Sequence, residues 1–213
     1  MKERGTFITF EGIDGSGKTT QLRLLAERLR SEGRSVVETV EPGGTAIGKQ
    51  IRRILLDSGN QELDPIAELL LYFASRAQNV EQTIRPALAS GHIVLCDRFT
   101  DSTLVYQGCG RNLGAATVLD LDRIACRGLK PDLTLLIDID LDTSLARAHA
   151  RNATTASGAE TRMDEQSVDF HRKVREAYLA LAERERDRFR VIDGRNDVAG
   201  VAAAVWNVVR PYV

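Results

Sequence analysis

The chain has 213 residues, enough to bury the core of one α/β domain but few for two, so we expect a single domain spanning 1–213. Its 29 basic and 30 acidic side chains give a formal net charge of −1, which provides no overall field to attract nucleic acid or a membrane surface. Three cysteines without metal-ligand spacing favour a reducing compartment, and the chain has neither a leader-like apolar core nor about 18 successive apolar residues, so we expect a cytoplasmic protein.

Apolar and β-branched residues cluster in five short segments, which we expect to be strands: 6–10, 35–40, 92–97, 132–140 and 189–193. Longer segments with helical periodicity separate them, and this alternation predicts βαβ units around a parallel sheet, an α/β fold. The first helix should run from Lys18 to Glu32 and end before Gly33.

A second helix should begin at Pro65, with Asp64 as its N-cap, and should break at Pro86. Gly91 should end the helix that follows. Small and polar residues with arginines near both ends fill the segment 147–164, which we expect to be a mobile lid.

A phosphate-binding motif follows the first strand, with Gly12, four further residues, then Gly17, Lys18 and Thr19. Its glycines let backbone N–H groups point at phosphate oxygens, and the helix N-terminus adds partial positive charge. Lys18 should contact the β- and γ-phosphates, and the Thr19 hydroxyl should ligate Mg²⁺. A glycine-rich turn without a ligand is the alternative, but the strand-to-helix context favours binding of ATP by the following set: Gly12, Ile13, Asp14, Gly15, Ser16, Gly17, Lys18, Thr19 and Thr20.

Candidate acceptor residues begin with Glu41 and Pro42, after the second strand, at the sheet edge where ligands of open α/β sheets bind. A simple tight turn is the alternative. Tyr72 and Arg76 lie four residues apart on one helix face, so the ring could stack on a base while the guanidinium donates to it. A core aromatic beside a solvated arginine is the competing interpretation.

Asp97 and Arg98 end the third strand, at the same edge as the phosphate loop. Asp97 could bind Mg²⁺ directly or through water, and Arg98 could bind a phosphate, although a structural salt bridge is the alternative. Thr103, Tyr106 and Gln107 follow at helical spacing and could face one base and its sugar.

The order of these motifs resembles the bacterial thymidylate kinase family: "EGIDGSGKTTQ", "EPGGT", "ASRAQ", "DRFTDSTLVYQGCGR" and "PDLTLLIDID". The resemblance covers nearly the whole chain and implies a three-layer P-loop kinase fold, with a five-stranded parallel sheet and a lid. It also implies transfer of the γ-phosphoryl group of ATP to dTMP, giving dTDP, with Mg²⁺ and usually as a homodimer.

The resemblance also assigns roles. Asp14 matches a loop carboxylate that faces the acceptor or its metal, Arg98 matches the arginine on the acceptor phosphate, and Tyr106 matches the residue that disfavours a ribose 2′-hydroxyl. Thymine would contact the remaining positions, with Phe73 as the neighbouring alternative for the stacking ring and Arg52 as a weaker member: Arg52, Tyr72, Phe73, Arg76, Thr103 and Gln107.

The loop carries no basic residue at Gly15 or Ser16, which resembles the branch that supplies a catalytic arginine from the lid. We expect Arg162 to approach the transferring phosphoryl group, with Arg151 as its rival. Surface arginines without this role are the alternative. A kinase for another small acceptor, or a nucleotide-dependent switch, would share the phosphate loop.

Overall fold

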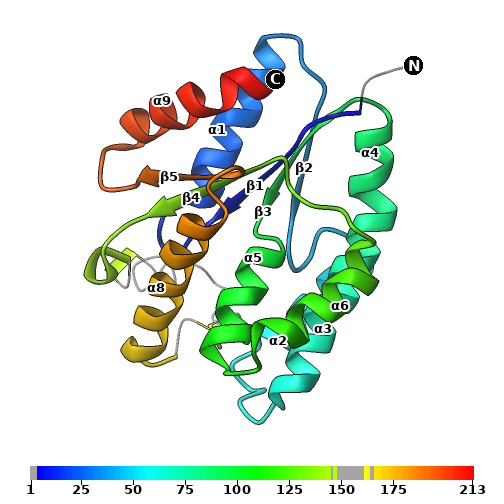
Figure 1. The fold of residues 1–213 in the computed structure, drawn as a ribbon, viewed down its shortest axis with the longest axis vertical. Helices are drawn as coiled ribbons and strands as arrows, with labels where there is room; N and C mark the ends of the chain where they lie inside the picture. Colours follow the sequence, from blue (N-terminus) through cyan, green and yellow to red (C-terminus); the bar gives the residue numbers. More distant parts are fainter. Residues whose placement is uncertain (1–3, 145, 148–160, 164–165) are drawn as a thin grey trace.

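A computed structural model describes residues 4–144, 146–147, 161–163 and 166–213. At its centre is a parallel sheet of five strands in the order β2-β3-β1-β4-β5 (Figure 1). The strands are β1 Phe7–Glu11, β2 Val36–Val40, β3 Ile93–Asp97, β4 Leu133–Asp138 and β5 Phe189–Asp193. All five lie where the apolar segments predicted them, and the parallel α/β class is confirmed.

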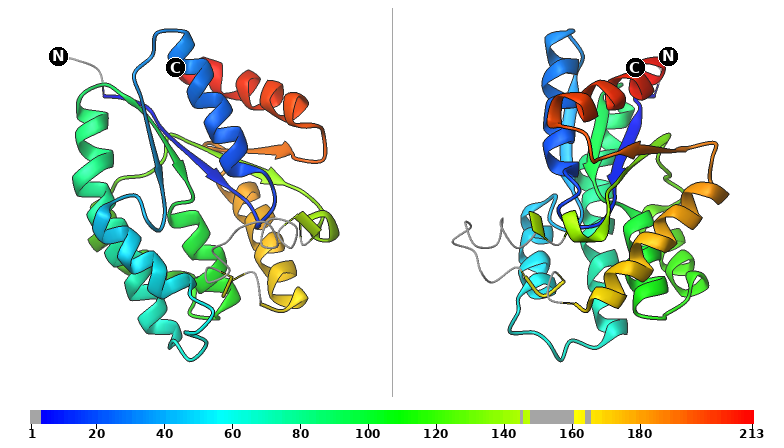
Figure 2. Two further views of the ribbon diagram at one scale, coloured as in Figure 1. Left: turned by 180° about the vertical axis from the view of Figure 1, so that it is seen from behind. Right: turned by 90° about the vertical axis from the view of Figure 1, so that its left-hand side faces the viewer.

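Helices cover both faces of this sheet. Their bounds are α1 Lys18–Ser31, α2 Ala46–Leu56, α3 Pro65–Asn79, α4 Arg85–Ala89, α5 Thr100–Thr103, α6 Ala115–Cys126, α8 Val168–Arg184 and α9 Val198–Val209. Helices α1 and α9 share one core cluster with β1 and β4, whereas α3, α4, α6 and α8 pack on the opposite face. The turned views show these layers (Figure 2).

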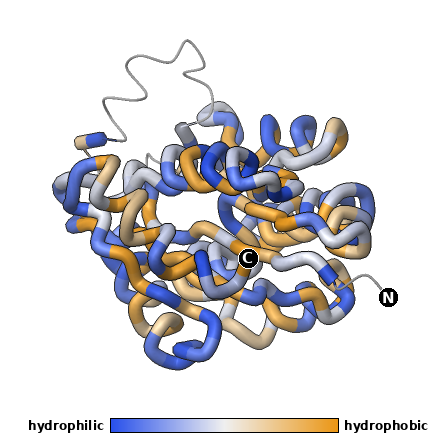
Figure 3. The backbone as a smooth tube through the Cα atoms, turned by 90° about the horizontal axis from the view of Figure 1, so that it is seen from above, coloured by the Kyte–Doolittle hydropathy of each residue, from blue (hydrophilic) through white to orange (hydrophobic). Residues whose placement is uncertain are grey.

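Along the helices, apolar and polar residues alternate in the pattern that one-sided burial requires (Figure 3). The predicted helix ends are confirmed at two places. Gly33 adopts φ 79° directly after α1 and its C-cap, and Asp64 Oδ1 accepts from the amides of Ile66 at 2.8 Å and Ala67 at 3.2 Å.

Helical structure continues past Pro86, where we expected a break. The α-helical hydrogen bonding of α3 ends at Asn79, π-helical turns span Val80–Ile84, and α4 then contains Pro86 near its start. Proline has no N–H and its ring crowds the carbonyl four residues earlier, and wider π turns before it change the hydrogen-bond register. Gly91, at φ 78°, follows α4 as predicted.

The sheet register aligns the carboxyl ends of β1 and β3, since Phe10 pairs with Asp97. The chain therefore leaves β1 into the phosphate loop beside the point where it leaves β3 into Arg98. Within the described part of the chain, no helix is both long enough and apolar enough to cross a membrane.

Candidate active site

The phosphate loop has a backbone that its glycines permit. Gly12, Gly15 and Gly17 all have positive φ, at 138°, 75° and 95°. A Cβ atom on Gly12 would lie 2.4 Å from the carbonyl oxygen of Ile137, so a larger residue would displace β4. Helix α1 begins directly after Gly17, and its free amides therefore face the loop.

Lys18 is buried beside this loop and lines the cavity. Its Nζ donates to the carbonyl oxygen of Ile13 at 2.8 Å. Burial, together with the nearby guanidinium of Arg98, lowers the pKa of Lys18 from 10.5 to about 8, although neighbouring carboxylates oppose this shift. A phosphate group on the loop would stabilise the charged form of this amine.

Thr19 and Asp97 come together from α1 and β3, and the Thr19 hydroxyl donates to the Asp97 carboxylate. Both residues line the cavity. Mg²⁺ in nucleotide sites prefers oxygen ligands and takes one or two from protein, with water and phosphates completing its coordination. A hydroxyl and a carboxylate at the phosphate loop fit that ion.

Arg98 lies where β3 ends and contacts the loop, in the uncommon backbone conformation φ 69°. Its Nη2 donates to Asp14 Oδ1 at 2.7 Å, and Nη1 donates to the carbonyl oxygen of Gly12 at 3.1 Å. The Tyr106 hydroxyl donates to Asp14 Oδ2 at 3.1 Å. Arg98 therefore pairs with Asp14 and not with its chain neighbour Asp97, which leaves Asp97 to Thr19.

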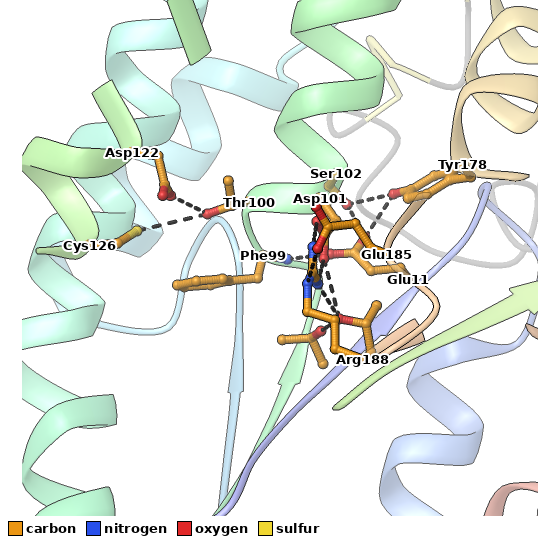
Figure 4. Close-up of polar contacts among 12 residues, drawn as sticks. Glu11, Phe99, Thr100, Asp101, Ser102, Asp122, Cys126, Tyr178, Glu185 and Arg188 are labelled. Carbon is orange, nitrogen blue, oxygen red and sulfur yellow. Dashed lines mark hydrogen bonds and ion pairs between the residues drawn. The ribbon is translucent and has the colours of Figure 1, made fainter. Parts of the chain in front are cut away.

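The buried carboxyl group of Glu11, at the end of β1, contacts the residue before α5, helix α5 itself and helix α8 (Figure 4). It accepts from the Phe99 amide at 2.8 Å, Ser102 Oγ at 2.5 Å and the Tyr178 hydroxyl at 2.8 Å. Ser102 and Tyr178 also accept from Arg98 Nη1, at 3.2 and 3.3 Å. Burial, then the nearby Asp101 carboxylate, raises the pKa of Glu11 to about 7.

Sequence reasoning missed Glu11, Ser102 and Tyr178. A glutamate ending an apolar strand, in "TFITFE", is the one local signal of a buried carboxyl group with a polar partner. The serine and tyrosine carry no such signal, because their role depends on contacts between α5, α8 and β1.

Arg76 lies buried at the acceptor end of the cavity. Its Nη2 donates to Thr103 Oγ1 at 2.9 Å, while Nη1 and Nε have no hydrogen-bond partner among the described residues. Glu41 Oε2 is 4.0 Å from Arg76 Nε and also lacks a hydrogen-bond partner there. These atoms are closed to solvent, and unpaired buried polar groups of this kind are costly.

One cavity of about 1220 Å³ connects these groups. Its lining includes the expected loop, metal and acceptor residues as follows: Asp14, Gly15, Ser16, Gly17, Lys18, Thr19, Thr20, Glu41, Pro42, Arg52, Tyr72, Arg76, Asp97, Arg98, Thr103, Tyr106 and Gln107. Gly12 and Ile13 contribute backbone carbonyls to Arg98 and Lys18. The volume exceeds that of most single-ligand pockets, which suits two nucleotides.

The β5–α9 connection also reaches the cavity, through Gly194, Asn196, Asp197 and Val198. Sequence reasoning did not select this segment, because it carries no recognisable motif and lies far along the chain from the loop.

Phe73 does not line the cavity, whereas its neighbour Tyr72 does. The Phe73 ring is buried in the core with Phe7 and Phe99. Successive residues on a helix point about 100° apart, so only one of the two rings can face the site. The structure places Tyr72 there, and the alternative assignment to Phe73 is corrected.

Arg162 differs from its expected position at the phosphates. It is buried, its Nη2 donates to Glu68 Oε2 at 2.7 Å, and its Nε donates to the carbonyl oxygen of Leu55 at 2.6 Å. It does not line the cavity, whereas Arg147 does. A buried carboxylate is a stronger partner than solvent, which explains this placement. Arg151 and lid residues 148–160 and 164 lie outside the described residues.

Burial raises the pKa of Glu41 from 4.5 to about 7, although Arg76 and Asn79 oppose this shift. We therefore expect the free energy of unfolding of the ligand-free protein to fall as the pH rises. At pH values between these two pKa values, the unfolded chain has lost a proton that the folded chain keeps. Glu41 therefore lowers the free energy of unfolding by up to about 1.4 kcal/mol for each unit by which the pH rises. Glu41→Gln should remove that part of the slope. Urea unfolding between pH 5 and pH 8 measures it, and equal slopes for both proteins would contradict the assignment.

Comparison with known proteins agrees with this geometry. The family model described as thymidylate kinase matches residues 10–205. The chain is 53% identical over 201 residues to the thymidylate kinase of Pelobacter propionicus, covering 94% of this chain and 92% of that protein. It is 52% identical over 205 residues to that of Geobacter sulfurreducens, covering 96% of each.

Among solved structures, the crystal structure of thymidylate kinase from Ehrlichia chaffeensis is similar, with a TM-score of 0.78 and 34% identity. The similarity covers 97% of this chain and 99% of the other. Sequence match, shared fold and the arrangement of the phosphate loop with Arg98 agree, and the chain therefore belongs to the thymidylate kinase family, whose members phosphorylate dTMP to dTDP with ATP.

Proposed function

We propose that this cavity catalyses transfer of the γ-phosphoryl group of ATP to the 5′-phosphate of dTMP, giving dTDP, by the residue roles set out below. One observation carries the proposal: the phosphate loop and the polar residues of the acceptor end line the same cavity. A nucleotide-dependent switch would not need the second set of groups.

At the donor end, loop amides and Lys18 hold the β- and γ-phosphates of ATP. Thr19 and Asp97 hold Mg²⁺ at the same place, directly or through water. When bound, the ion neutralises charge that develops on the phosphate oxygens. Phosphoryl transfer asks little covalent chemistry of the protein, so rate depends on alignment and on charge neutralisation.

At the acceptor end, Arg98 binds the 5′-phosphate of dTMP, and its guanidinium is held in place because it donates to Asp14 and to the Tyr106 hydroxyl. The Tyr72 ring stacks on thymine, and the Arg76 guanidinium donates to a thymine oxygen. Tyr106 faces the sugar and disfavours a ribose 2′-hydroxyl, while Thr103, Gln107, Glu41, Pro42 and Arg52 complete the pocket.

An arginine from the lid completes the neutralisation of negative charge on the transferring phosphoryl group. Arg147 lines the cavity, and Arg151 is the remaining candidate from the lid sequence. Arg162 serves a different purpose in the described conformation, because its guanidinium is committed to Glu68 and Leu55.

The whole chain acts as one domain, since a single sheet carries every helix layer and the site lies along one edge of it. We assign it to the cytoplasm, where the exposed thiol of Cys109 and the buried thiols of Cys96 and Cys126 would stay reduced.

A homodimer would cover apolar side chains that gather on three adjacent helices. These residues are Ile47 and Ile54 on α2, Ile66 and Leu70 on α3, and Leu119 and Ile124 on α6. Helix α3 packs against both α2 and α6, so the six residues lie on neighbouring elements. Exposed apolar surfaces of this kind mark interaction sites.

The activity is tested by ADP release from Mg²⁺-ATP with dTMP, dUMP, ribosylthymine monophosphate, dCMP or AMP as the acceptor. We expect strong preference for dTMP, because the pocket presents donors to an oxygen-bearing base. Tight ATP binding without acceptor-dependent ADP release would favour the switch, and preference for another acceptor would require new roles for Tyr72, Arg76 and Gln107.

Among the three lid arginines, we expect Arg147→Ala or Arg151→Ala to lower kcat by roughly 10³-fold, the effect of an arginine that contacts the transferring group. Arg162→Ala should instead lower the thermal stability, because it leaves Glu68 with one buried cation fewer. Steady-state kinetics and thermal melting of all three variants distinguish these outcomes. A large kcat loss in Arg162→Ala alone, at unchanged stability, would contradict the assignment.

For the dimer, light scattering should give about twice the chain mass of 23.5 kDa. Leu70→Asp should shift the protein to the monomer, because Leu70 is 50% exposed in the proposed interface. Val191→Asp is the matched control, since Val191 is equally exposed but lies on edge strand β5. A monomeric parent protein would exclude the interface.

A further inference from the structure

Glu68 is a fully buried carboxylate in the first turn of α3 on which three donors converge. Gln107 Nε2 donates to its Oε1 at 2.8 Å, and Arg162 Nη2 donates to its Oε2 at 2.7 Å. Arg111 donates to both oxygens, at 3.4 Å through Nε and 3.2 Å through Nη2. The three donors come from segments far from α3 in the sequence.

The two arginines determine whether Glu68 donates or accepts in its hydrogen bond with Gln107. A carboxylate between two guanidinium groups bears negative charge and has only acceptor atoms to offer. Gln107 must therefore turn its amide nitrogen toward Glu68. Its amide oxygen, on the other branch of the same planar group, is then the atom available to the cavity that Gln107 lines.

An amide oxygen at this place selects among pyrimidines. Thymine and uracil carry an N–H donor at N3 and an oxygen at C4, whereas cytosine has an acceptor at N3 and an amino donor at C4. Gln107 Oε1 can accept from an imide N–H but would oppose the cytosine N3 lone pair. Arg76 also lines the cavity, and a guanidinium can only donate, so it complements the C4 oxygen in the same sense.

We infer that Glu68 is a positioning residue for base selection: through Gln107 it presents an acceptor to the base, so that the site takes imide pyrimidines and rejects cytosine. This inference deepens the proposed function, because it concerns the acceptor base of the same site. Arg162 and Arg111 both donate to the Glu68 carboxylate, and Arg111 still contacts both of its oxygens when Arg162 is removed.

Glu68→Gln is the informative substitution, because it preserves shape but lets residue 68 donate as well as accept. Gln107 can then reverse its amide and turn Nε2 toward the cavity. We expect dTMP to bind more weakly and dCMP more tightly, and the ratio of their dissociation constants to narrow at least about fivefold, as the exchange of one buried hydrogen bond predicts. Titration calorimetry with dTMP and dCMP measures this ratio.

Arg162→Met is the matched control. It removes one partner of the same carboxylate and leaves Glu68 unable to donate, so the dTMP-to-dCMP ratio should stay within about twofold of the parent. If Glu68→Gln does not fold, Glu68→Gln combined with Arg162→Met removes one buried cation, and this double variant is compared with Arg162→Met alone.

An unchanged ratio in Glu68→Gln, or an equal change in Arg162→Met, would overturn the inference and leave Glu68 with a structural role. Failure of the parent protein to bind either nucleotide would overturn it as well. Turnover of dTMP by the parent protein is measured separately, so an inactive protein that still discriminates by binding would refute the proposed reaction and not the role of Glu68.

Discussion

The buried carboxyl group of Glu11 is the contact on which the acceptor end of the site depends. It ends β1, where the phosphate loop begins, and it accepts from the backbone of Phe99 and the side chains of Ser102 and Tyr178. Those two side chains in turn contact the guanidinium of Arg98. Through the amide of Phe99, Glu11 stabilises the uncommon backbone conformation of Arg98, and through Ser102 and Tyr178 it positions the Arg98 side chain. The low dielectric of this buried site strengthens each of these hydrogen bonds.

A second polar network connects the same region to the residue that precedes β5. Arg188 donates to both oxygens of Asp101 at 2.7 and 2.8 Å, and Asp101 lies next to Ser102 on α5 (Figure 4). Arg188 directly precedes β5 and also donates to Thr134 near the start of β4, so this pair links α5 to the beginnings of these two strands. The negative charge of Asp101 lies near Glu11 and disfavours a second negative charge there, which explains part of the raised pKa of Glu11.

Buried polar groups around the acceptor pocket are of two kinds, those with hydrogen-bond partners on every polar atom and those with atoms that lack one. Glu68 and Glu11 have full sets of donors and hold other side chains still, whereas Arg76 and Glu41 retain buried atoms without partners among the described residues. Unpaired buried groups of this kind cost stability. In the proposed function, Glu68 and Glu11 hold other side chains in place, whereas Arg76 and Glu41 lie at the pocket that binds the acceptor.

Local features of the sequence were sufficient for the strands, the phosphate loop and the cap at Asp64, because each depends on short-range periodicity or on a contiguous motif. The choice of Tyr72 over Phe73, the partner of Arg98, the π turns before Pro86 and the burial of Arg162 against Glu68 were decided by the tertiary structure. In each case two or more segments distant in the chain compete for one side chain, and burial, charge pairing and packing across those segments determine which contact forms.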